Sequence, residues 1–271
     1  MALEQTIGEG STAKVIVLDE RTVVKQFFDR VSPSSIENEY LKSKAVMHSG
    51  LPVPAVLMKV IHNAQPALLY ERINGSPLTQ KLSKQPWTAF HLINQMANLQ
   101  VLMHDKEISG LPQQVDIMQQ KITLVNELSE AEKCLIAERL SKLSTGNSLC
   151  HGDFHPDNIL LDDRGPVIID WTDASRGNRL ADLARTLVIL QYGGLPSGMK
   201  PFKRKAVLYV RNLLAGKYLK SYRRSFHFSL DSLEEWILPI AAARLSENLS
   251  DQEKEKLVML IKQYIENDVL K

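Results

Sequence analysis

The middle of the chain carries two acids and an amide with the types and spacing that phosphoryl transfer needs. The sequence reads His151-Gly-Asp-Phe-His-Pro-Asp-Asn158, and a short apolar run then leads into Asp170. Phosphoryl transfer requires a carboxylate near the attacking hydroxyl and oxygen ligands for the Mg²⁺ that neutralises the phosphates. Asp153 suits the first role, and Asn158 and Asp170 suit the second.

The same segment also allows a hydrolytic metal site. His151, Asp153 and His155 alternate with other residues, and a His-x-Asp-x-His pattern can present three ligands on one side of a strand or turn. Because magnesium prefers oxygen ligands, both histidines are structural in the phosphoryl-transfer interpretation: His151 braces the loop and His155 lies nearby. A chelatable transition metal that copurified with the protein would favour the hydrolase.

A glycine-bearing loop near the start of the chain is suited to phosphate binding. Residues 7–15 read IGEGSTAKV and include Gly8, Gly10 and Ser11. Glycines let backbone N–H groups approach a phosphate without obstruction. A dinucleotide fingerprint has similar letters, but it must follow a strand and open a helix, whereas β-rich sequence follows here. An ordinary hairpin turn is the other interpretation.

Lys25 lies within Val23-Val-Lys-Gln-Phe27, whose apolar residues predict a mostly buried strand. A buried lysine needs a partner. Glu37 and Glu39 follow on a predicted helix, but they are about 200° apart around its axis, so only one can face the lysine. Periodicity does not decide between them, and an edge-strand lysine that reaches water is the alternative.

The elements around these residues divide into a β-rich part and a helical part. The first part is predicted to hold one helix at 36–48, with Ile36, Tyr40 and Met47 on one face, and strands at 14–18, 21–28, 55–61 and 67–70. The second part is predicted to hold short strands at 148–150, 159–161 and 167–169, and helices at 87–104, 116–128, 130–144, 180–192, 201–222, 233–247 and 251–270.

Composition sets wider limits. The 271 residues carry a net charge of +2, which gives no general footprint for nucleic acid or for an anionic membrane. Cys134 and Cys150 are too few for a disulfide framework, which suits a reducing compartment, and we expect the cytoplasm. The start of the chain lacks an apolar signal core, and no apolar run approaches the roughly 18 residues that span a bilayer. We therefore expect neither export by a standard signal nor membrane insertion.

Together the motifs resemble those of the protein kinase superfamily. They are more similar to the aminoglycoside phosphotransferase/choline kinase family, whose catalytic loop reads HGDxxxxN and is matched here at His151, Gly152, Asp153 and Asn158. The resemblance covers residues 7 to about 185. It implies an α+β, protein kinase-like two-lobed fold: a small β-rich N-terminal lobe with one helix over residues 1–74, a hinge at about 70–75, and a larger helical lobe over 75–271.

The resemblance also implies roles for individual residues. Asp153 is catalytic, and the metal ligands are Asn158 and Asp170. Cofactor binding falls to Gly8, Gly10 and Ser11 in the loop, to Lys25 with Glu39 as its partner, and to the backbone of Glu71 and Ile73, with Tyr70 at the back of the pocket. Asp182 and His104 are expected to be structural. The cofactors are ATP or GTP and Mg²⁺.

The acceptor is expected to be a small-molecule hydroxyl. Only eleven residues separate Asp170 from Asp182, which leaves no room for the activation loop that a protein substrate needs. Residues 183–230 hold ten Lys or Arg and no acid, whereas residues 231–271 hold nine acids and five bases, so the charge of the acceptor stays open. Antibiotics such as an aminoglycoside or a macrolide, and metabolites such as an amino alcohol or a sugar, are all candidates. The alternative is a nucleotide-binding regulator that lacks transfer activity.

Overall fold

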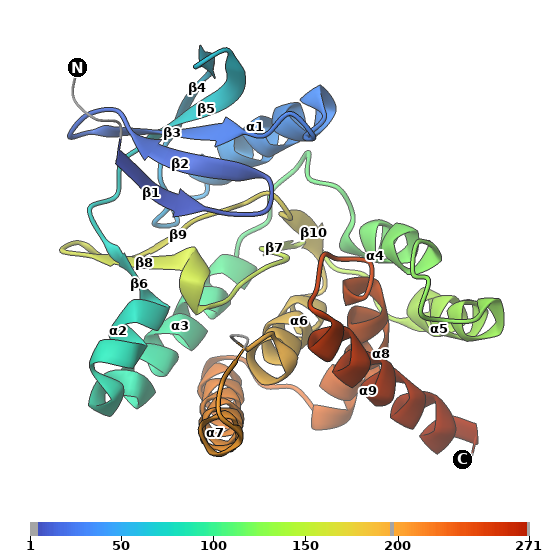
Figure 1. The fold of residues 1–271 in the computed structure, drawn as a ribbon. Coiled ribbons are helices and arrows are strands. Elements are labelled where there is room, and N and C mark those ends of the chain that lie inside the picture. The colour runs from blue at the N-terminus through green and yellow to red at the C-terminus, as the bar shows by residue number, and fades with distance from the viewer. Residues whose placement is uncertain (1–4, 196–197, 270–271) are drawn as a thin grey trace. The chain divides into compact units, whose positions relative to one another are not determined.

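The computed structural model describes residues 5–195 and 198–269, and its chain divides into two compact units (Figure 1). Unit 1 comprises residues 1–84, 108–111 and 156–174, and unit 2 comprises residues 85–107, 112–155 and 175–271. Each unit combines several separate segments of the chain, whereas the predicted boundary between residues 74 and 75 divides the chain only once. That boundary stays a prediction.

Unit 1 contains a five-stranded antiparallel sheet in the order β1-β2-β3-β5-β4. The strands are β1 (Gln5–Glu9), β2 (Ala13–Val17), β3 (Thr22–Phe27), β4 (Val56–His62) and β5 (Gln65–Glu71). Strands β2 to β5 confirm the four predicted ones. β1 was expected to be loop; instead it pairs with β2, with a shift of register between Thr6 and Gly8. The turn that carries Gly10 and Ser11 therefore joins two paired strands.

Helix α1 (Pro33–Met47) packs against β4 and β5. It begins three residues before the predicted start, because the Ser32 hydroxyl caps the backbone N–H of Ser35 and a proline suits the first helical turn. Its buried residues are Ile36, Glu39, Ser43 and Val46. Of the expected face, Tyr40 packs against the core cluster that contains Ile36, whereas Met47 is only partly buried. The polar Glu39 takes an inward position because it has a charged partner inside unit 1.

A second, smaller sheet of unit 1 has the order β6-β8-β9, with β6 (Ser76–Pro77), β8 (Ile159–Asp162) and β9 (Gly165–Ile168). A Cβ at Gly75 would lie 2.8 Å from the Leu161 carbonyl oxygen, so only glycine permits this approach of β8. The 3-10 turn η2 (Pro156–Asn158) precedes the β8–β9 hairpin, and Asp170 follows it. The backbone N–H of Ile169 donates to the Asn158 carbonyl over 3.0 Å, which holds the two ends of the hairpin together.

Unit 2 is helical apart from two paired strands, β7 (Ser148–Cys150) and β10 (Ser175–Gly177). Its helices are α3 (Ala89–His104), α4 (Gln114–Thr123), α5 (Glu130–Lys142), α6 (Arg179–Tyr192), α7 (Pro201–Ser225), α8 (Leu230–Arg244) and α9 (Asp251–Val269). The short segment η1 (Pro86–Thr88) takes up the first residues of the predicted helix 87–104, and α2 (Leu78–Lys84), in unit 1, was not predicted. α3 packs against α7, and α6 packs against α8.

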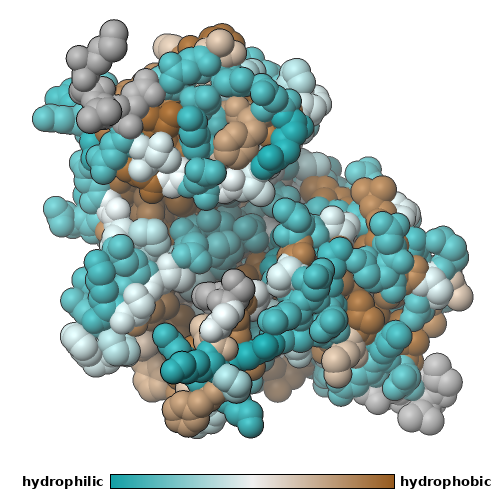
Figure 2. Space-filling model, in the orientation of Figure 1, coloured by the Kyte–Doolittle hydropathy of each residue, from teal (hydrophilic) through white to brown (hydrophobic). Residues whose placement is uncertain are grey.

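Every predicted helix is present, and α4 and α8 end well before their predicted ends. α4 ends at Thr123 rather than Leu128, and the buried Val125 and Leu128 belong to the turn that follows it. α8 ends at Arg244 rather than Glu247. The predicted end of the last helix at Leu270 lies outside the described residues. Within these residues no helix is both long and apolar enough to cross a membrane, and hydrophilic side chains cover most of the face in Figure 2.

Candidate active site

The predicted nucleotide-binding residues surround a pocket of unit 1, whose lining comes from that unit alone. Its volume of about 260 Å³ is near the lower end of ordinary small-molecule sites. The apolar part of its wall comprises Ile7, Val15, Val23, Pro54, Tyr70, Leu160, Ile169 and Trp171. Of the predicted site residues, Gly10, Ser11, Lys25, Glu39, Glu71, Ile73, Asn158 and Asp170 all line it. Gly8 lies in β1 and is not among the lining residues, and Asp153 belongs to unit 2.

Lys25 forms the charged centre of this pocket. Its Nζ lies 2.6 Å from Glu39 Oε1 and 3.1 Å from Asp170 Oδ1. Burial opposes a charge on the amine, but Asp170 and Glu39 outweigh it and raise the Lys25 pKa. Glu37 points elsewhere and pairs with the exposed Lys59 over 2.6 Å. The structure therefore makes Glu39 the helix partner of Lys25.

Thr172 is a site residue that sequence reasoning missed. Its hydroxyl lies 2.7 Å from Asp170 Oδ1 and 2.9 Å from Glu39 Oε2, and it can donate to one of them at a time. Lys42 Nζ donates to the Thr172 carbonyl over 2.7 Å. Asp170 has φ of 62°, a left-handed conformation that is unusual for a residue other than glycine. No pattern in the sequence signals this turn, and the contacts of Thr172 depend on it.

Asn158 and Asp170 fit a divalent cation. Both side chains line the pocket, and the bond between the Ile169 amide and the Asn158 carbonyl keeps their backbones adjacent. An amide oxygen and a carboxylate are hard donors, which suit Mg²⁺ completed by water and phosphate oxygens. By contrast, the described residues contain no group of three or more His, Cys, Asp or Glu side chains arranged to hold a metal. The hydrolase alternative with His151, Asp153 and His155 therefore has no ligand cluster to support it.

The predicted hinge borders the same pocket. The Glu71 side chain is engaged within the protein, because it accepts from the Ala55 amide over 3.2 Å and pairs with Arg164 over 3.3 Å. The Tyr70 hydroxyl lies 3.1 Å from Ser43 Oγ and donates to Glu39 over 3.3 Å. Burial and the charge of Glu39 raise the Tyr70 pKa, so the phenol stays protonated. Any recognition of a base at Glu71 and Ile73 would thus fall to the backbone.

The glycine loop is held by its own backbone and by an arginine that the sequence did not reveal. Gly10 N donates to the Ala13 carbonyl over 2.9 Å. The Arg30 guanidinium donates to the Ser11 carbonyl and lies 5.0 Å from the centre of the Phe28 ring. A Cβ at Gly8 or Gly10 would meet its nearest neighbour at 3.9 Å, so packing within the protein does not require glycine at either position.

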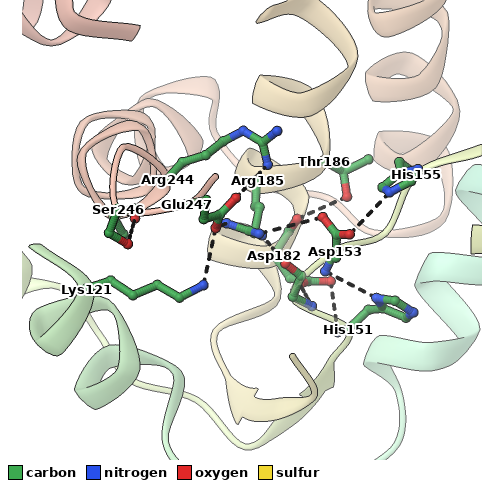
Figure 3. Close-up of polar contacts among 12 residues, drawn as sticks. Lys121, His151, Asp153, His155, Asp182, Arg185, Thr186, Arg244, Ser246 and Glu247 are labelled. Atoms are coloured by element: carbon green, nitrogen blue, oxygen red, sulfur yellow. Dashed lines mark hydrogen bonds and ion pairs between the residues drawn. The ribbon is translucent and has the colours of Figure 1, made fainter. Parts of the chain in front are cut away.

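The catalytic-loop residues of unit 2 surround Asp153 with nitrogen groups (Figure 3). Its Oδ2 lies 3.2 Å from His155 Nε2, and its backbone N–H donates to His151 Nδ1 over 3.2 Å. Burial would raise the Asp153 pKa, but the hydrogen bond and charge of His155 and the charges of Arg185 and His151 outweigh burial and hold it well below its usual range. Asp153 is therefore a carboxylate at neutral pH.

Asp182 supports this loop from helix α6. It accepts hydrogen bonds from the Gly152 amide over 2.8 Å and from the His151 amide over 3.4 Å. Its Oδ2 lies 3.0 Å from His104 Nε2, and His104 Nδ1 lies 2.6 Å from the Tyr222 hydroxyl. Asp182, His151, His104 and Tyr222 are buried, and Gly152 is partly buried. The predicted structural roles of Asp182 and His104 are confirmed.

The sheet-bearing unit, the helical unit and the acid-lysine pocket define the class of protein kinase-like phosphotransferases. The chain belongs to the phosphotransferase enzyme family, whose model matches residues 5–210. As a member of this family the protein is a small-molecule kinase. The alternative of a metal-dependent hydrolase is therefore wrong. No curated protein matches the chain.

Solved structures confirm the predicted fold. A thermostable mutant of the aminoglycoside phosphotransferase APH(4)-Ia, in a ternary complex with AMP-PNP and hygromycin B, has a TM-score of 0.66 at 15% identity over 97% of this chain and 92% of that one. The amicoumacin kinase hAmiN, with AMP-PNP, Ca²⁺ and Ami, has a TM-score of 0.62 at 15% identity over 96% and 87%. A GDP complex of an aminoglycoside 2′-phosphotransferase IIIa mutant has a TM-score of 0.59 at 15% identity over 98% and 92%. At these identities the likeness shows the fold alone.

Proposed function

We propose that the protein transfers the γ-phosphoryl group of ATP or GTP to a hydroxyl of a small molecule in the presence of Mg²⁺. The observation that carries this proposal is the convergence of Lys25, Glu39 and Asp170 within 3.1 Å in a pocket that Asn158 and the glycine loop also line. One ammonium between two carboxylates leaves the cluster with a net negative charge. The surplus negative charge suits a divalent metal ion, and the ammonium suits the phosphates that this ion accompanies.

The pocket offers separate surfaces for the two ends of a nucleotide. Its apolar residues suit a flat base, and the backbone at Glu71 and Ile73 offers hydrogen bonds at its edge. Its polar residues suit the phosphates: the backbone N–H groups of the turn that follows Gly10, whose own N–H bonds the Ala13 carbonyl, and the ammonium of Lys25. Since packing does not demand Gly10, which lines the pocket, we attribute this glycine to the close approach of a phosphate. The neighbours bind AMP-PNP in two cases and GDP in a third, so either base remains in the proposal.

The residues of this chain prepare the transfer chiefly by position and charge. Asp153 and Asn158 are five residues apart in one continuous loop, which is the reason for assigning them to one site. Asp153 accepts a hydrogen bond from the acceptor hydroxyl and orients its oxygen towards the γ-phosphorus. As the new P–O bond forms and the β–γ bridge bond breaks, the hydroxyl proton passes to Asp153. A carboxylate with such a low pKa is a weak base, so we expect orientation to dominate its role.

Asn158 and Asp170 would hold the magnesium ion, which supplies charge neutralisation for the phosphate oxygens when bound. Lys25 contributes a further positive charge, and Glu39 keeps the amine in place. In this mechanism His151 and His155 act on the loop and not on a metal. The regulator alternative has nothing specific in its favour, because each of these positions holds a competent residue.

The ion pairs of unit 2 favour a neutral or anionic acceptor over a polycation. Two of the acids in the C-terminal stretch, Glu247 and Glu253, are paired with arginines, over 2.8 Å to Arg185 and 2.7 Å to Arg244 respectively. They therefore present little uncompensated negative charge to a cationic drug. A hydroxyl-bearing sugar or a similar uncharged compound suits this balance best.

The proposal is tested by an acceptor screen with ATP and with GTP in the presence of Mg²⁺, run on the wild type, on Asp153→Ala and on Asp163→Asn as the matched control. Asp163 is an exposed acid at the tip of the β8–β9 hairpin. We expect acceptor-stimulated turnover in the wild type and the control, and none in Asp153→Ala, which should still bind nucleotide. Turnover that survives in Asp153→Ala would overturn the role of Asp153. Stimulation by aminoglycosides alone would overturn the inferred acceptor class.

A further inference from the structure

Arg185 lies in helix α6, one turn beyond Asp182, and its side chain is 8% exposed. A guanidinium is always charged, so burial at this level needs compensating partners. In the sequence, Arg185 belongs to the basic stretch of residues 183–230, which by itself indicates no particular role. The structure instead places it at the catalytic loop (Figure 3).

The guanidinium of Arg185 uses three nitrogens on three different groups. Nε donates to the Gly152 carbonyl, one terminal nitrogen lies 3.6 Å from Asp153 Oδ1, and the other lies 2.8 Å from Glu247 Oε1. Three contacts on different groups fix the orientation of the planar guanidinium. A lysine ammonium on a flexible side chain would not be oriented in this way. Asp182 takes the N–H of Gly152 while Arg185 takes its C=O. Two residues of α6 therefore hold the backbone immediately before Asp153.

Glu247 fixes the other side of the guanidinium. It lies just past the end of α8 and also pairs with Arg244 and with Lys121, each over 3.2 Å. Burial would raise the Glu247 pKa, but the charges of Arg185, Lys121 and Arg244 outweigh burial and lower it. Arg244 is held in turn by Glu253 of α9 over 2.7 Å. These six charged side chains, which we call the Arg185 network, comprise Lys121, Asp153, Arg185, Arg244, Glu247 and Glu253.

The network balances its charges, with three cations and three carboxylates. Ion pairs of this kind contribute little net stability but define geometry closely, because a displaced charge would be left unpaired in a poorly solvated place. Asp153 is its most exposed carboxylate, at 32%, and it lies between the imidazole of His155 and the guanidinium of Arg185. Its orientation is thus set by partners on both oxygens.

We propose that Arg185 is the positioning residue of Asp153, and that Glu247 keeps Arg185 in the orientation that this role needs. The inference rests on the proposed function, because it takes Asp153 to be the carboxylate that orients the acceptor hydroxyl. Through Glu247, Arg244 and Glu253 the junction of α8 and α9 then determines how well Asp153 is aligned. Acceptor turnover should therefore depend on residues of the C-terminal region that touch neither nucleotide nor phosphate.

The first test compares Arg185→Met, Arg185→Lys and the control Arg179→Gln in steady-state kinetics and nucleotide binding. Arg179 lies in the same helix, but it bonds the His104 carbonyl and Asp105 instead. A catalytic group that is misplaced by about 1 Å costs on the order of 100-fold in rate, so we expect a kcat loss of that size in Arg185→Met. Nucleotide affinity should be unchanged, because the pocket belongs to unit 1. Arg185→Lys should recover only part of the rate, and the control should keep it.

A purely structural role is distinguished by chemical rescue. Guanidinium ion at low millimolar concentration should raise the turnover of a further variant, Arg185→Ala, and leave Arg185→Lys unchanged, because only the alanine variant vacates the place of the guanidinium group. The acid limb of the kcat profile should also move to higher pH in Arg185→Met, since one charge that lowers the Asp153 pKa is gone. Wild-type kcat in Arg185→Met, or a loss in Arg185→Ala that guanidinium does not relieve, would overturn the proposal.

The second test is a double-mutant cycle of Arg185→Met and Glu247→Gln. If Glu247 acts through Arg185, Glu247→Gln alone should lower kcat by a smaller factor, and the double variant should be no slower than Arg185→Met. If instead the fold losses in kcat of the two single variants multiply in the double variant, the two residues act separately and the proposed coupling is wrong. If Asp153→Asn itself keeps full turnover, the proposed function fails. If Asp153→Asn is inactive while Arg185→Met is not, only the present inference fails.

Discussion

The acidic groups of the two units are arranged for different tasks. In unit 1, Lys25 is shared by Glu39 and by Asp170, and the Asp170 side chain is 45% exposed on the pocket wall. In unit 2, Asp182 is 1% exposed and is surrounded by donors, and the Arg185 network pairs every carboxylate with a cation. The first cluster carries surplus negative charge that a metal ion can satisfy, and the second is already satisfied. The unpaired charge of unit 1 thus suits the binding of a charged ligand, and the paired charges of unit 2 suit keeping a loop in one geometry.

Variants in unit 2 should therefore cost more folding stability than variants in unit 1, and the largest cost should come from Asp182→Asn. It removes the charge that accepts from two loop amides and from His104. Breaking a buried charged pair costs about 3–5 kcal/mol, and we expect that loss in urea unfolding. The exposed variant Asp163→Asn should stay near the wild type. A stability equal to that of the wild type would contradict the role given to Asp182.

The same residue predicts how stability changes with pH. The Asp182 pKa is lowered in the folded protein, because hydrogen bonds and the charge of His104 outweigh burial. The stability that it contributes is therefore complete above the unfolded value of 3.8 and is lost as the pH falls towards the lower folded value. Asp182→Asn should flatten this acid dependence in urea unfolding measured from pH 6 downwards. An unchanged slope would show that other carboxylates cause it.

An intermediate effect is expected from Glu39→Gln, with Glu37→Gln as its matched control on the same helix. Glu39 is 3% exposed and bonds Lys25, whereas Glu37 is 44% exposed and pairs with Lys59 at the surface. Loss of a buried charge-assisted hydrogen bond costs about 1.5–3 kcal/mol, and loss of an exposed pair costs about 0.2–1 kcal/mol. Thermal unfolding of both variants measures the difference. Equal losses would mean that Glu39 is not specifically engaged.

The smallest effect should follow Thr172→Val, which keeps the shape and removes the hydroxyl between Glu39 and Asp170. One hydrogen bond contributes about 0.5–1.5 kcal/mol, and we expect a stability loss near the lower end because Thr172 is exposed. Metal-nucleotide affinity should fall slightly as Asp170 loses a contact. Calorimetric titration of the variant measures this change, and an affinity equal to that of the wild type would remove Thr172 from the site.

Local sequence patterns were enough to predict much of this arrangement. Alternating apolar residues located β2 to β5, and helical periodicity located each long helix. The loop from His151 to Asn158 indicated where phosphoryl-transfer chemistry would lie. The choice of Glu39 over Glu37 needed the family pattern, because periodicity alone allowed either.

The missing parts depend on contacts between distant segments. Val125 and Leu128 looked helical because they are apolar, yet they enter the core from a turn. The Arg185 network joins α4, α6, α8 and α9 through charged side chains, and such pairs leave no periodic signal in a sequence. Thr172 reaches its partners only because of the left-handed backbone at Asp170.

The central claim is that the pocket of unit 1 binds a metal-bound nucleotide through Asp170. Calorimetric titration of ATP, with and without Mg²⁺, into the wild type and Asp170→Ala tests it most directly. We predict tight binding to the wild type that depends on Mg²⁺, and weak binding to Asp170→Ala that Mg²⁺ does not improve. Equal magnesium-dependent affinity in the two proteins would contradict the account.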